Sequence, residues 1–103
     1  MMDNRILTSL GLCAKAGKLI FGVPMIIEAM QKGKKIYLVI ESGDTSDNTH
    51  KKITDKCSFY GVKKIQIEAD GGVLASAVGK MSSLAALAIT EEGFYKMISK
   101  YFD

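Results

Sequence analysis

The five residues Ile36-Tyr37-Leu38-Val39-Ile40 are the clearest strand in the sequence. They are continuously apolar, and three of them are β-branched. A strand without polar alternation is typical of the interior of a sheet that is covered on both faces. Leu84 to Ile89 is a second continuous apolar run. The sequence therefore predicts two interior strands.

Two shorter strands and five helices are predicted around these two runs. Leu19 to Phe21 is a brief apolar run, and Lys64 to Ile67 alternates polar with apolar residues, as a strand near a sheet edge does. Apolar residues at helical spacing, with capping residues before them and glycines after them, predict the helices. The expected helix starts are Asp3, Pro24, Ser46 or Asp47, Asp70 and Thr90, and the expected ends are Gly17, Gly33, Gly61 and Gly79.

The predicted elements follow the order α-β-α-β-α-β-α-β-α, without an internal repeat. Alternation of this kind places a sheet between two layers of helices, and about 100 residues suffice for four strands. The apolar face of the second helix is expected to include Met25, the inner face of the third Tyr60, and that of the fourth Val73. A chain of 103 residues that is 48% hydrophobic and 24% charged fits one soluble globular domain, residues 1–103.

The charges divide the chain into a basic and an acidic part. Residues 1–64 hold 11 basic and 6 acidic side chains, whereas residues 65–103 hold 3 and 5, giving the net charge of +3. A basic half favours an anionic partner, because lysines displace the counterions condensed on a phosphate backbone. A lysine surface that is merely solvated is the alternative.

Several functional classes find no support in the sequence. No signal peptide and no run of about 20 apolar residues is present, so we expect a cytoplasmic protein without a membrane partner. Cys13 and Cys57 belong to no CxxC pair and have no histidine at ligand spacing, so they are expected to be reduced and buried, with no metal site. The glycines lack GxGxxG spacing, and we expect no cofactor and no small-molecule substrate.

An enzymatic site is weakly indicated at best. The only histidine, His50, is expected at the exposed start of the third helix, two turns before Cys57. A thiol and an imidazole on one face could form a catalytic pair, but a cysteine in an apolar stripe is usually inert. Glu41 and Asp44 follow the central strand and are expected to be acids of a surface loop. We therefore expect no catalytic residues.

Two lysine-rich patches flank the predicted second helix. Lys15-Ala16-Gly17-Lys18 precedes the short first strand, and Lys32-Gly33-Lys34-Lys35 follows the helix. The helix itself begins at Gly22-Val23-Pro24, where unpaired amide groups and the positive end of the dipole can face a phosphate or a base edge. This arrangement indicates a nucleic-acid surface.

These segments resemble the ribosomal protein superfamily of L-seven-Ae and L-thirty-e type, and within it the small bacterial YlxQ-like members. The resemblance begins with the Ala-Gly-Lys turn, the glycine-opened second helix and the Gly-Lys-Lys exit between Leu10 and Lys35. It extends over nearly the whole chain through Asn48-Thr49, Thr54-Asp55-Lys56-Cys57, Val78-Gly79-Lys80, Ala88-Ile89-Thr90 and Gly93-Phe94.

The resemblance implies a three-layer α/β/α sandwich with a mixed four-stranded sheet that recognises kink-turns in structured RNA. The first recognition element would be Gly22, Val23, Pro24 and Met25, with Glu28 one turn on, which contact the bases of the kink. The second would be the loop after the fourth helix, which packs on bases flipped out of the bend. This loop contains Gly79, Lys80, Met81, Ser82 and Ser83.

The expected RNA-binding protein is non-enzymatic, with the phosphates positioned by Lys15, Lys18, Lys32, Lys34 and Lys80. The family pattern favours polar residues after the glycine and then a lysine, where this chain has Val23, Pro24, Met25 and Glu28. Two alternatives therefore stay open. One is a protein-interaction or self-association module, such as a homodimer, that uses the apolar turn from Val23 to Ile27. The other is a small enzyme that uses Cys57 or Asp44.

Overall fold

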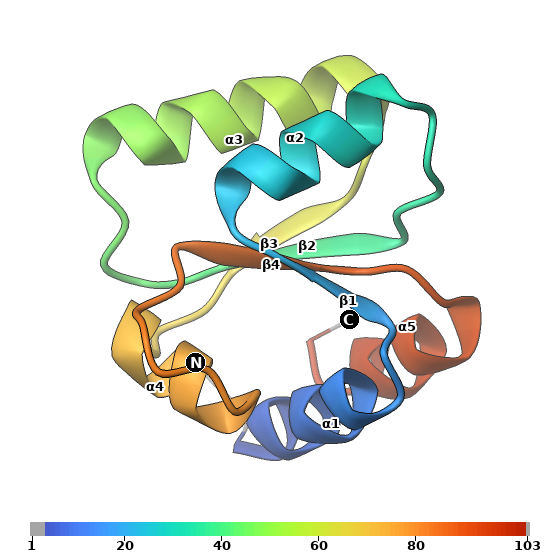
Figure 1. Cartoon of the computed structure of the whole chain (residues 1–103), viewed down its shortest axis with the longest axis vertical. Helices are drawn as coiled ribbons and strands as arrows, with labels where there is room; N and C mark the ends of the chain where they lie inside the picture. The colour runs from blue at the N-terminus through green and yellow to red at the C-terminus, as the bar shows by residue number, and fades with distance from the viewer. Residues whose placement is uncertain (1–3, 103) are drawn as a thin grey trace.

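The computed structural model describes residues 4–102, which form five helices and one four-stranded sheet (Figure 1). The predicted order of elements is confirmed along the whole described chain. The elements are α1 (Asn4–Lys15), β1 (Leu19–Phe21), α2 (Val23–Gln31), β2 (Leu38–Glu41), α3 (Asp47–Tyr60), β3 (Lys64–Gln66), α4 (Gly71–Ala77), β4 (Ala86–Ile89) and α5 (Glu92–Ser99).

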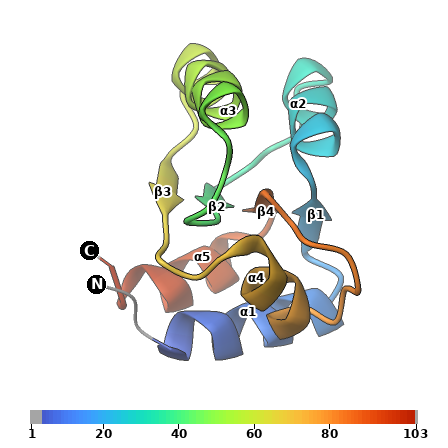
Figure 2. The same cartoon turned by 90° about the vertical axis from the view of Figure 1, so that its left-hand side faces the viewer.

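The sheet is mixed, with strand order β1-β4-β2-β3. β4 pairs antiparallel with both β1 and β2, whereas β2 and β3 are parallel. Helices α2 and α3 cover one face, and α1, α4 and α5 cover the other (Figure 2). The predicted three-layer α/β/α sandwich is therefore confirmed.

The two interior strands are buried on both faces, as their continuous apolar character predicts. Every residue of β2 and β4 is buried. Side chains on one face of the sheet, such as Leu38 and Leu87, join the core under α1, α4 and α5, while Val39 and Ala88 join the core under α2 and α3. β2 begins two residues later than expected and includes Glu41, and β4 begins two residues later than the expected Leu84.

Local capping signals place two helix starts correctly. The Ser46 hydroxyl accepts a hydrogen bond from the Thr49 amide at 3.2 Å, and the Asp70 carboxylate accepts one from the Val73 amide at 2.9 Å. Each bond satisfies an amide of the first turn that has no partner within the helix. At the other end of α3, Gly61 adopts the left-handed conformation with φ 68°, as predicted.

The predicted cap of α5 is wrong, and the cap predicted for α1 lies outside the described residues. The Thr90 hydroxyl and amide both donate hydrogen bonds to the Lys18 carbonyl, each at 3.0 Å. Thr90 therefore links the segment before α5 to the residue before β1. Glu91 caps α5 instead, accepting from the Phe94 amide at 3.3 Å. Asp3, expected to cap α1, is not among the described residues.

Three side chains assigned to apolar helix faces are exposed, and one of them is Met25 of α2, which is 54% exposed. Tyr60 is 38% exposed and Val73 is 45% exposed, whereas Ile53 and Leu74 on the same helices are fully buried. Tyr60 is the last residue of α3 and lines a hollow beside the end of α2 instead of packing in the core. Within residues 4–102, no helix has both the length and the apolar composition needed to cross a bilayer.

Gly71 is required by a close approach between the start of α4 and the segment before β4. A Cβ at Gly71 would lie 2.2 Å from the Ser83 hydroxyl and 2.7 Å from the Leu84 carbonyl oxygen. The Gly71 carbonyl accepts a hydrogen bond from the Leu84 amide at 3.0 Å, so the backbones are held together. This contact fixes the path of residues 80–85.

We predict that Gly71→Ala lowers the free energy of unfolding by about 2 kcal/mol, because the backbone of Leu84 must move to admit a methyl group. The neighbouring Gly72→Ala is the control. Its Cβ meets only the Asp70 side chain, at 3.3 Å, and we expect a change below about 1 kcal/mol. Urea unfolding followed by circular dichroism measures both. Equal stability of the two variants would contradict the proposed steric constraint.

Candidate nucleic-acid interface

Gly22 opens α2 in a conformation that only glycine adopts without strain. Its φ is 89°, and no side chain caps the helix start. The Gly22 amide donates to the Ala86 carbonyl at 3.0 Å, and its own carbonyl accepts from the Ile26 amide at 3.0 Å. Gly22 is therefore anchored to the first residue of β4, while the first turn of α2 keeps amide groups free of any side-chain cap.

The side chains that follow Gly22 divide between core and surface. Val23 is only 7% exposed, and Ile26 and Ile27 are buried with it between α2 and the sheet. Pro24 is exposed, and Met25 is 54% exposed. A ligand at this helix start would thus meet the Gly22 backbone, Pro24 and Met25, but not the Val23 side chain.

The segment after α4 lies beside this helix start. The Lys80 ammonium group is 4.3 Å from the centroid of the Phe21 ring, the residue immediately before Gly22. Met81 is fully exposed and Ser82 is exposed. Figure 2 looks onto this end of the molecule and shows the segment passing beside β1, below the start of α2. The structure therefore brings together two sets of predicted residues from separate parts of the sequence.

The loop between β2 and α3 completes the same end of the sheet. The Ser42 amide donates to the Ala85 carbonyl at 2.8 Å, and one Asp44 oxygen accepts from both the Gly71 amide at 2.9 Å and the Ser42 hydroxyl at 3.1 Å. Asp44 thus holds this loop against α4. Its contacts are those of a structural residue, which argues against a catalytic role.

The predicted lysines do not all lie at this end. The Lys18 carbonyl accepts from Thr90, beyond the last residue of β4, whereas Gly22 pairs with the first residue of β4. Lys32 and Lys34 follow the far end of α2, which spans nine residues and hence roughly 13 Å. Lys15 borders a groove of about 500 Å³ between α1 and α4, to which Gly79 also contributes.

A shallow hollow along α2 connects the start of this helix with the lysines that follow its end. Side chains from β1 and the exposed side of α2 line a hollow of about 230 Å³, which reaches from Met25 to Lys34. Glu28 also lines this hollow, and its carboxylate lies 3.5 Å from the Lys32 ammonium group. Both side chains are exposed. The Lys32 ammonium group offsets the negative charge of Glu28, which stands where the family pattern has a lysine.

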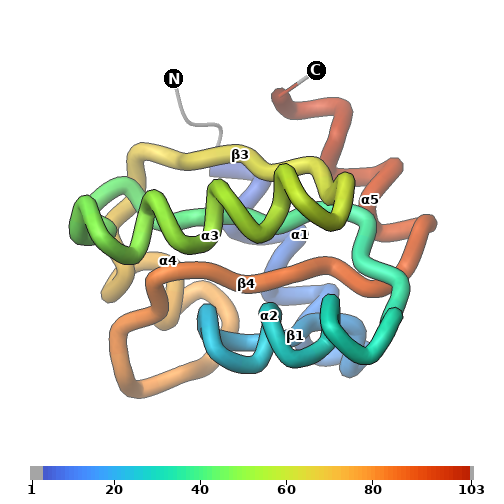
Figure 3. The backbone as a smooth tube through the Cα atoms, turned by 90° about the horizontal axis from the view of Figure 1, so that it is seen from above, coloured from blue at the N-terminus to red at the C-terminus, as the bar shows by residue number. Residues whose placement is uncertain are grey.

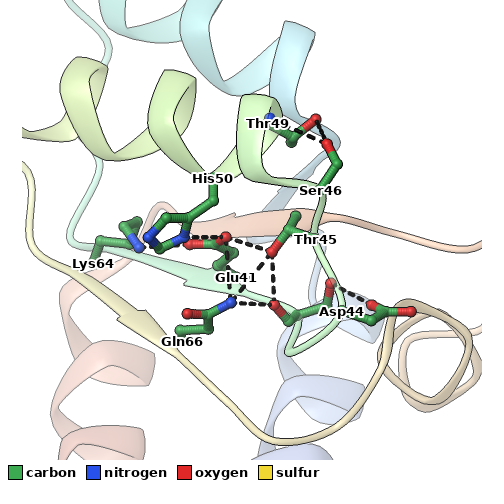
Figure 4. A network of polar contacts seen from close by, with 9 residues as sticks. Glu41, Asp44, Thr45, Ser46, Thr49, His50, Lys64 and Gln66 are labelled. Carbon is green, nitrogen blue, oxygen red and sulfur yellow. Dashed lines mark hydrogen bonds and ion pairs between the residues drawn. The ribbon is translucent and has the colours of Figure 1, made fainter.

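Glu41 is the main surprise, because the sequence predicted a loop acid at the surface and the structure buries it completely. Its carboxylate accepts from Lys64 Nζ at 2.5 Å, from His50 Nδ1 at 2.7 Å and from the Thr45 hydroxyl (Figure 4). Gln66 Nε2 lies 3.5 Å from the same carboxylate. These partners come from three elements, so the cluster joins α3 and β3 to the end of β2.

The hydrogen bonds to Glu41 decide its protonation state. Burial by itself raises the pKa of the Glu41 carboxyl, but hydrogen bonds from Lys64, Thr45 and His50 outweigh it, and the pKa lies below its ordinary value. His50 lies near the start of α3, as predicted, but it is half-buried, with 45% of its side chain exposed and its ring facing Glu41. Sequence spacing gave no signal for this cluster, because Lys64 lies 23 residues from Glu41.

Neither cysteine fits a nucleophilic role. Cys13 and Cys57 are free and buried, and burial raises the pKa of each thiol to about 11. A thiol in that state is almost entirely protonated at neutral pH. Among residues 4–102, no group of three histidine, cysteine or acidic side chains is arranged to hold a metal ion.

We predict that Glu41→Gln lowers the free energy of unfolding by about 3 kcal/mol at pH 7, because it leaves the Lys64 ammonium group, whose side chain is only 13% exposed, without its counter-charge. The folded-state pKa of Glu41 lies below the unfolded value. Its stabilising contribution is therefore complete above the unfolded pKa and is lost as the pH falls through the folded pKa. The difference between wild type and variant should shrink accordingly in urea titrations below about pH 4.

Glu28→Gln is the matched control for this prediction. Glu28 is 53% exposed and pairs with Lys32 four residues on, so we expect a change below about 1 kcal/mol at either pH. A Glu41→Gln protein as stable as wild type at pH 7 would show that the buried pair contributes nothing.

Comparison with known proteins places this geometry in a family. The model of the Ribosomal protein L7Ae/L30e/S12e/Gadd45 family matches residues 4–99. The RNA-binding protein YlxQ of Bacillus subtilis (strain 168) is 33% identical over 94 residues, which are 91% of each chain. The RNA-binding protein YlxQ of Enterococcus faecium is 30% identical over 93 residues, covering 90% of this chain and 86% of the relative.

Two solved structures share the fold. A protein of unknown function from Bacillus halodurans C superposes with a TM-score of 0.85 at 29% identity, over 96% of this chain and 97% of the other. The Giardia lamblia 15.5kD RNA binding protein superposes with a TM-score of 0.76 at 16% identity, over 98% and 88%. The chain described here is a YlxQ-like member of the Ribosomal protein L7Ae/L30e/S12e/Gadd45 family.

Proposed function

We propose that this protein binds structured RNA, and specifically a kink-turn or a similarly bent element, without catalysing a reaction. The observation that supports this most directly is the junction of two predicted recognition elements at one end of the sheet. The uncapped start of α2 at Gly22 lies next to the segment that contains Lys80, Met81 and Ser82. The relatives described as RNA-binding proteins support the same partner.

Each part of this surface would have a distinct role. The Gly22 backbone would approach the paired bases of the bend closely, because no Cβ stands in the way. The fully exposed Met81 would pack on a base turned out of the helix. Lys80 would contact a phosphate, and its position over the Phe21 ring holds the loop beside the start of α2.

The chain departs from the family pattern in a way that defines what it can contact. Pro24 has no amide hydrogen, and Met25 offers no group for a bidentate contact to a base edge. Recognition would therefore depend on the shape of the bent RNA, on backbone amides and on apolar packing. Lys15, which borders the groove next to Gly79, would add a phosphate contact on the other side of the loop.

Self-association through Val23 to Ile27 is the second candidate function, and the structure leaves few exposed apolar side chains to support it. Val23, Ile26 and Ile27 are buried against the sheet, so only Pro24 and Met25 are exposed in this turn. Two exposed side chains form a smaller apolar patch than a stable dimer interface requires. The RNA-binding proposal accounts for the neighbouring lysines as well.

We predict that wild-type protein binds a kink-turn RNA more tightly than a duplex of matched length in gel-shift titrations. Met81→Ala should reduce this preference by about 1 kcal/mol, since it removes apolar contact with an extruded base. Lys80→Ala should weaken binding to both RNAs and lower the slope of log affinity against log salt by about 1, because one phosphate contact is lost.

Lys96→Ala is the control, since Lys96 lies on α5 and pairs with Glu92 at 3.8 Å. We expect no change in affinity or in salt slope for this variant. Equal affinity of the wild-type protein for the kink-turn and for the duplex would refute shape recognition. Unaltered binding by both the Lys80 and Met81 variants would place the RNA elsewhere on the protein.

A further inference from the structure

We propose a second RNA contact at the opposite end of the molecule, where α2 and α3 both end. It would hold an unpaired nucleotide, with the base against the ring of Phe59 and the neighbouring phosphates at Lys34 and Lys35. This inference rests on the proposed function, since it extends the same RNA to a second surface. We call Lys34, Lys35, Phe59 and Tyr60 the aromatic–lysine surface.

The aromatic–lysine surface is built where two helices of the same layer run side by side. Figure 3 shows α2 and α3 lying next to each other over the sheet and ending at the same side of the molecule. A hollow of about 240 Å³ separates the two ends, and Lys34, Lys35 and Tyr60 line it. Gly33 and Gly61, which follow the helices, have φ values of 75° and 68° and turn the chain sharply at its rim.

The charge of this end is strongly positive. Residues 29–40 and 56–67, which form the ends of both helices and the segments after them, contain six lysines and no aspartate or glutamate. Lys64 is neutralised by the buried Glu41, and Lys32 pairs with Glu28 at 3.5 Å. The positive charge of this end therefore rests on the other lysines. Lys34 and Lys35 are exposed. An acidic polymer complements such a surface, because several cations can each meet one phosphate.

The aromatic side chains offer a ring on which a base can stack, in addition to the attraction of the lysines for phosphates. Phe59 is 80% exposed, which is unusual for a phenylalanine, and its ring lies edge to face with Tyr60 at 4.9 Å between centroids. One face of an exposed ring can stack on any base, and stacking beside lysines is how many proteins hold single strands.

A continuous path joins this surface to the proposed kink-turn site. Lys34 lines both the hollow between the helix ends and the hollow that runs along α2 to Met25. A strand that leaves the bent RNA at the start of α2 can follow the helix for roughly 13 Å and reach the aromatic–lysine surface. The continuity and the charge favour an RNA strand over a protein as the occupant.

The test uses a kink-turn RNA with and without a single-stranded tail, the tail containing one 2-aminopurine. In fluorescence anisotropy, the tail should raise the affinity of wild-type protein about tenfold, and 2-aminopurine fluorescence should fall on stacking. Phe59→Ala should abolish both effects and change the affinity for the untailed RNA less than about twofold. The double variant Lys34→Ala/Lys35→Ala should lower the affinity for the tailed RNA and its salt slope.

Two controls are needed. One distinguishes ring stacking from apolar bulk at position 59, and the other distinguishes the position of the lysines from total charge. Phe59→Leu keeps an apolar side chain but removes the ring, so it should also lose the fluorescence change. Lys96→Ala/Lys100→Ala removes two lysines from the opposite layer and should leave the effect of the tail intact. Phe59 is so exposed that its variants should retain the wild-type circular dichroism and thermal transition.

The outcomes distinguish this inference from the proposed function. Wild-type protein that prefers the kink-turn but gains nothing from the tail would overturn the second contact alone. Protein that binds the tailed and single-stranded RNAs through Phe59 without preferring the kink would overturn the kink-turn proposal and support the second contact. A dimer in sedimentation that Phe59→Ala dissociates, with tail binding unchanged, would assign this surface to self-association and overturn the inference.

Discussion

The antiparallel pairing of β2 with β4 is the constraint on which the rest of the structure depends. All eight residues of the two strands are buried, so their backbone amide and carbonyl groups have no access to water and must pair with neighbouring strands. Leu38 lies opposite Ile89, and Glu41 lies opposite Ala86. A shift of this register by one residue would turn every side chain to the other face of the sheet.

The hydrogen bonds just beyond this pairing fix the loops at both ends of the molecule. At one end, Gly22 and Ser42 donate to Ala86 and Ala85, which places the start of α2 and the β2–α3 loop beside the segment after α4. At the other end, Tyr37 donates to Ile89 and Thr90 donates to Lys18. A rigid, fully buried centre thus supports two functional surfaces that consist of loops and helix ends.

The buried Glu41 cluster has a related role in holding the layers together. Its carboxylate joins the end of β2 to His50 on α3 and to Lys64 on β3. A charge in this position is tolerated because several donors surround it, and removing Glu41 would leave the Lys64 ammonium group without its counter-charge. Figure 4 shows that the cluster includes Thr45 of the β2–α3 loop. Glu41 lies opposite Ala86, whose carbonyl accepts from the Gly22 amide, so the cluster stabilises the same end of the sheet that holds Gly22.

The sequence by itself determined the order of elements, the two interior strands and the caps at Ser46 and Asp70, because these depend on residues within a few positions of one another. It also indicated Gly22 and the lysines through local motifs and family resemblance. Only the tertiary structure decided the burial of Glu41, because its partner Lys64 is 23 residues away in the sequence. The same holds for Thr90, which donates a hydrogen bond to the Lys18 carbonyl 72 residues away instead of capping α5. The tertiary structure likewise buried Val23 and put Lys18, Lys32 and Lys34 at the end of the sheet away from Gly22, since strand order and register are set by long-range packing that no local pattern encodes.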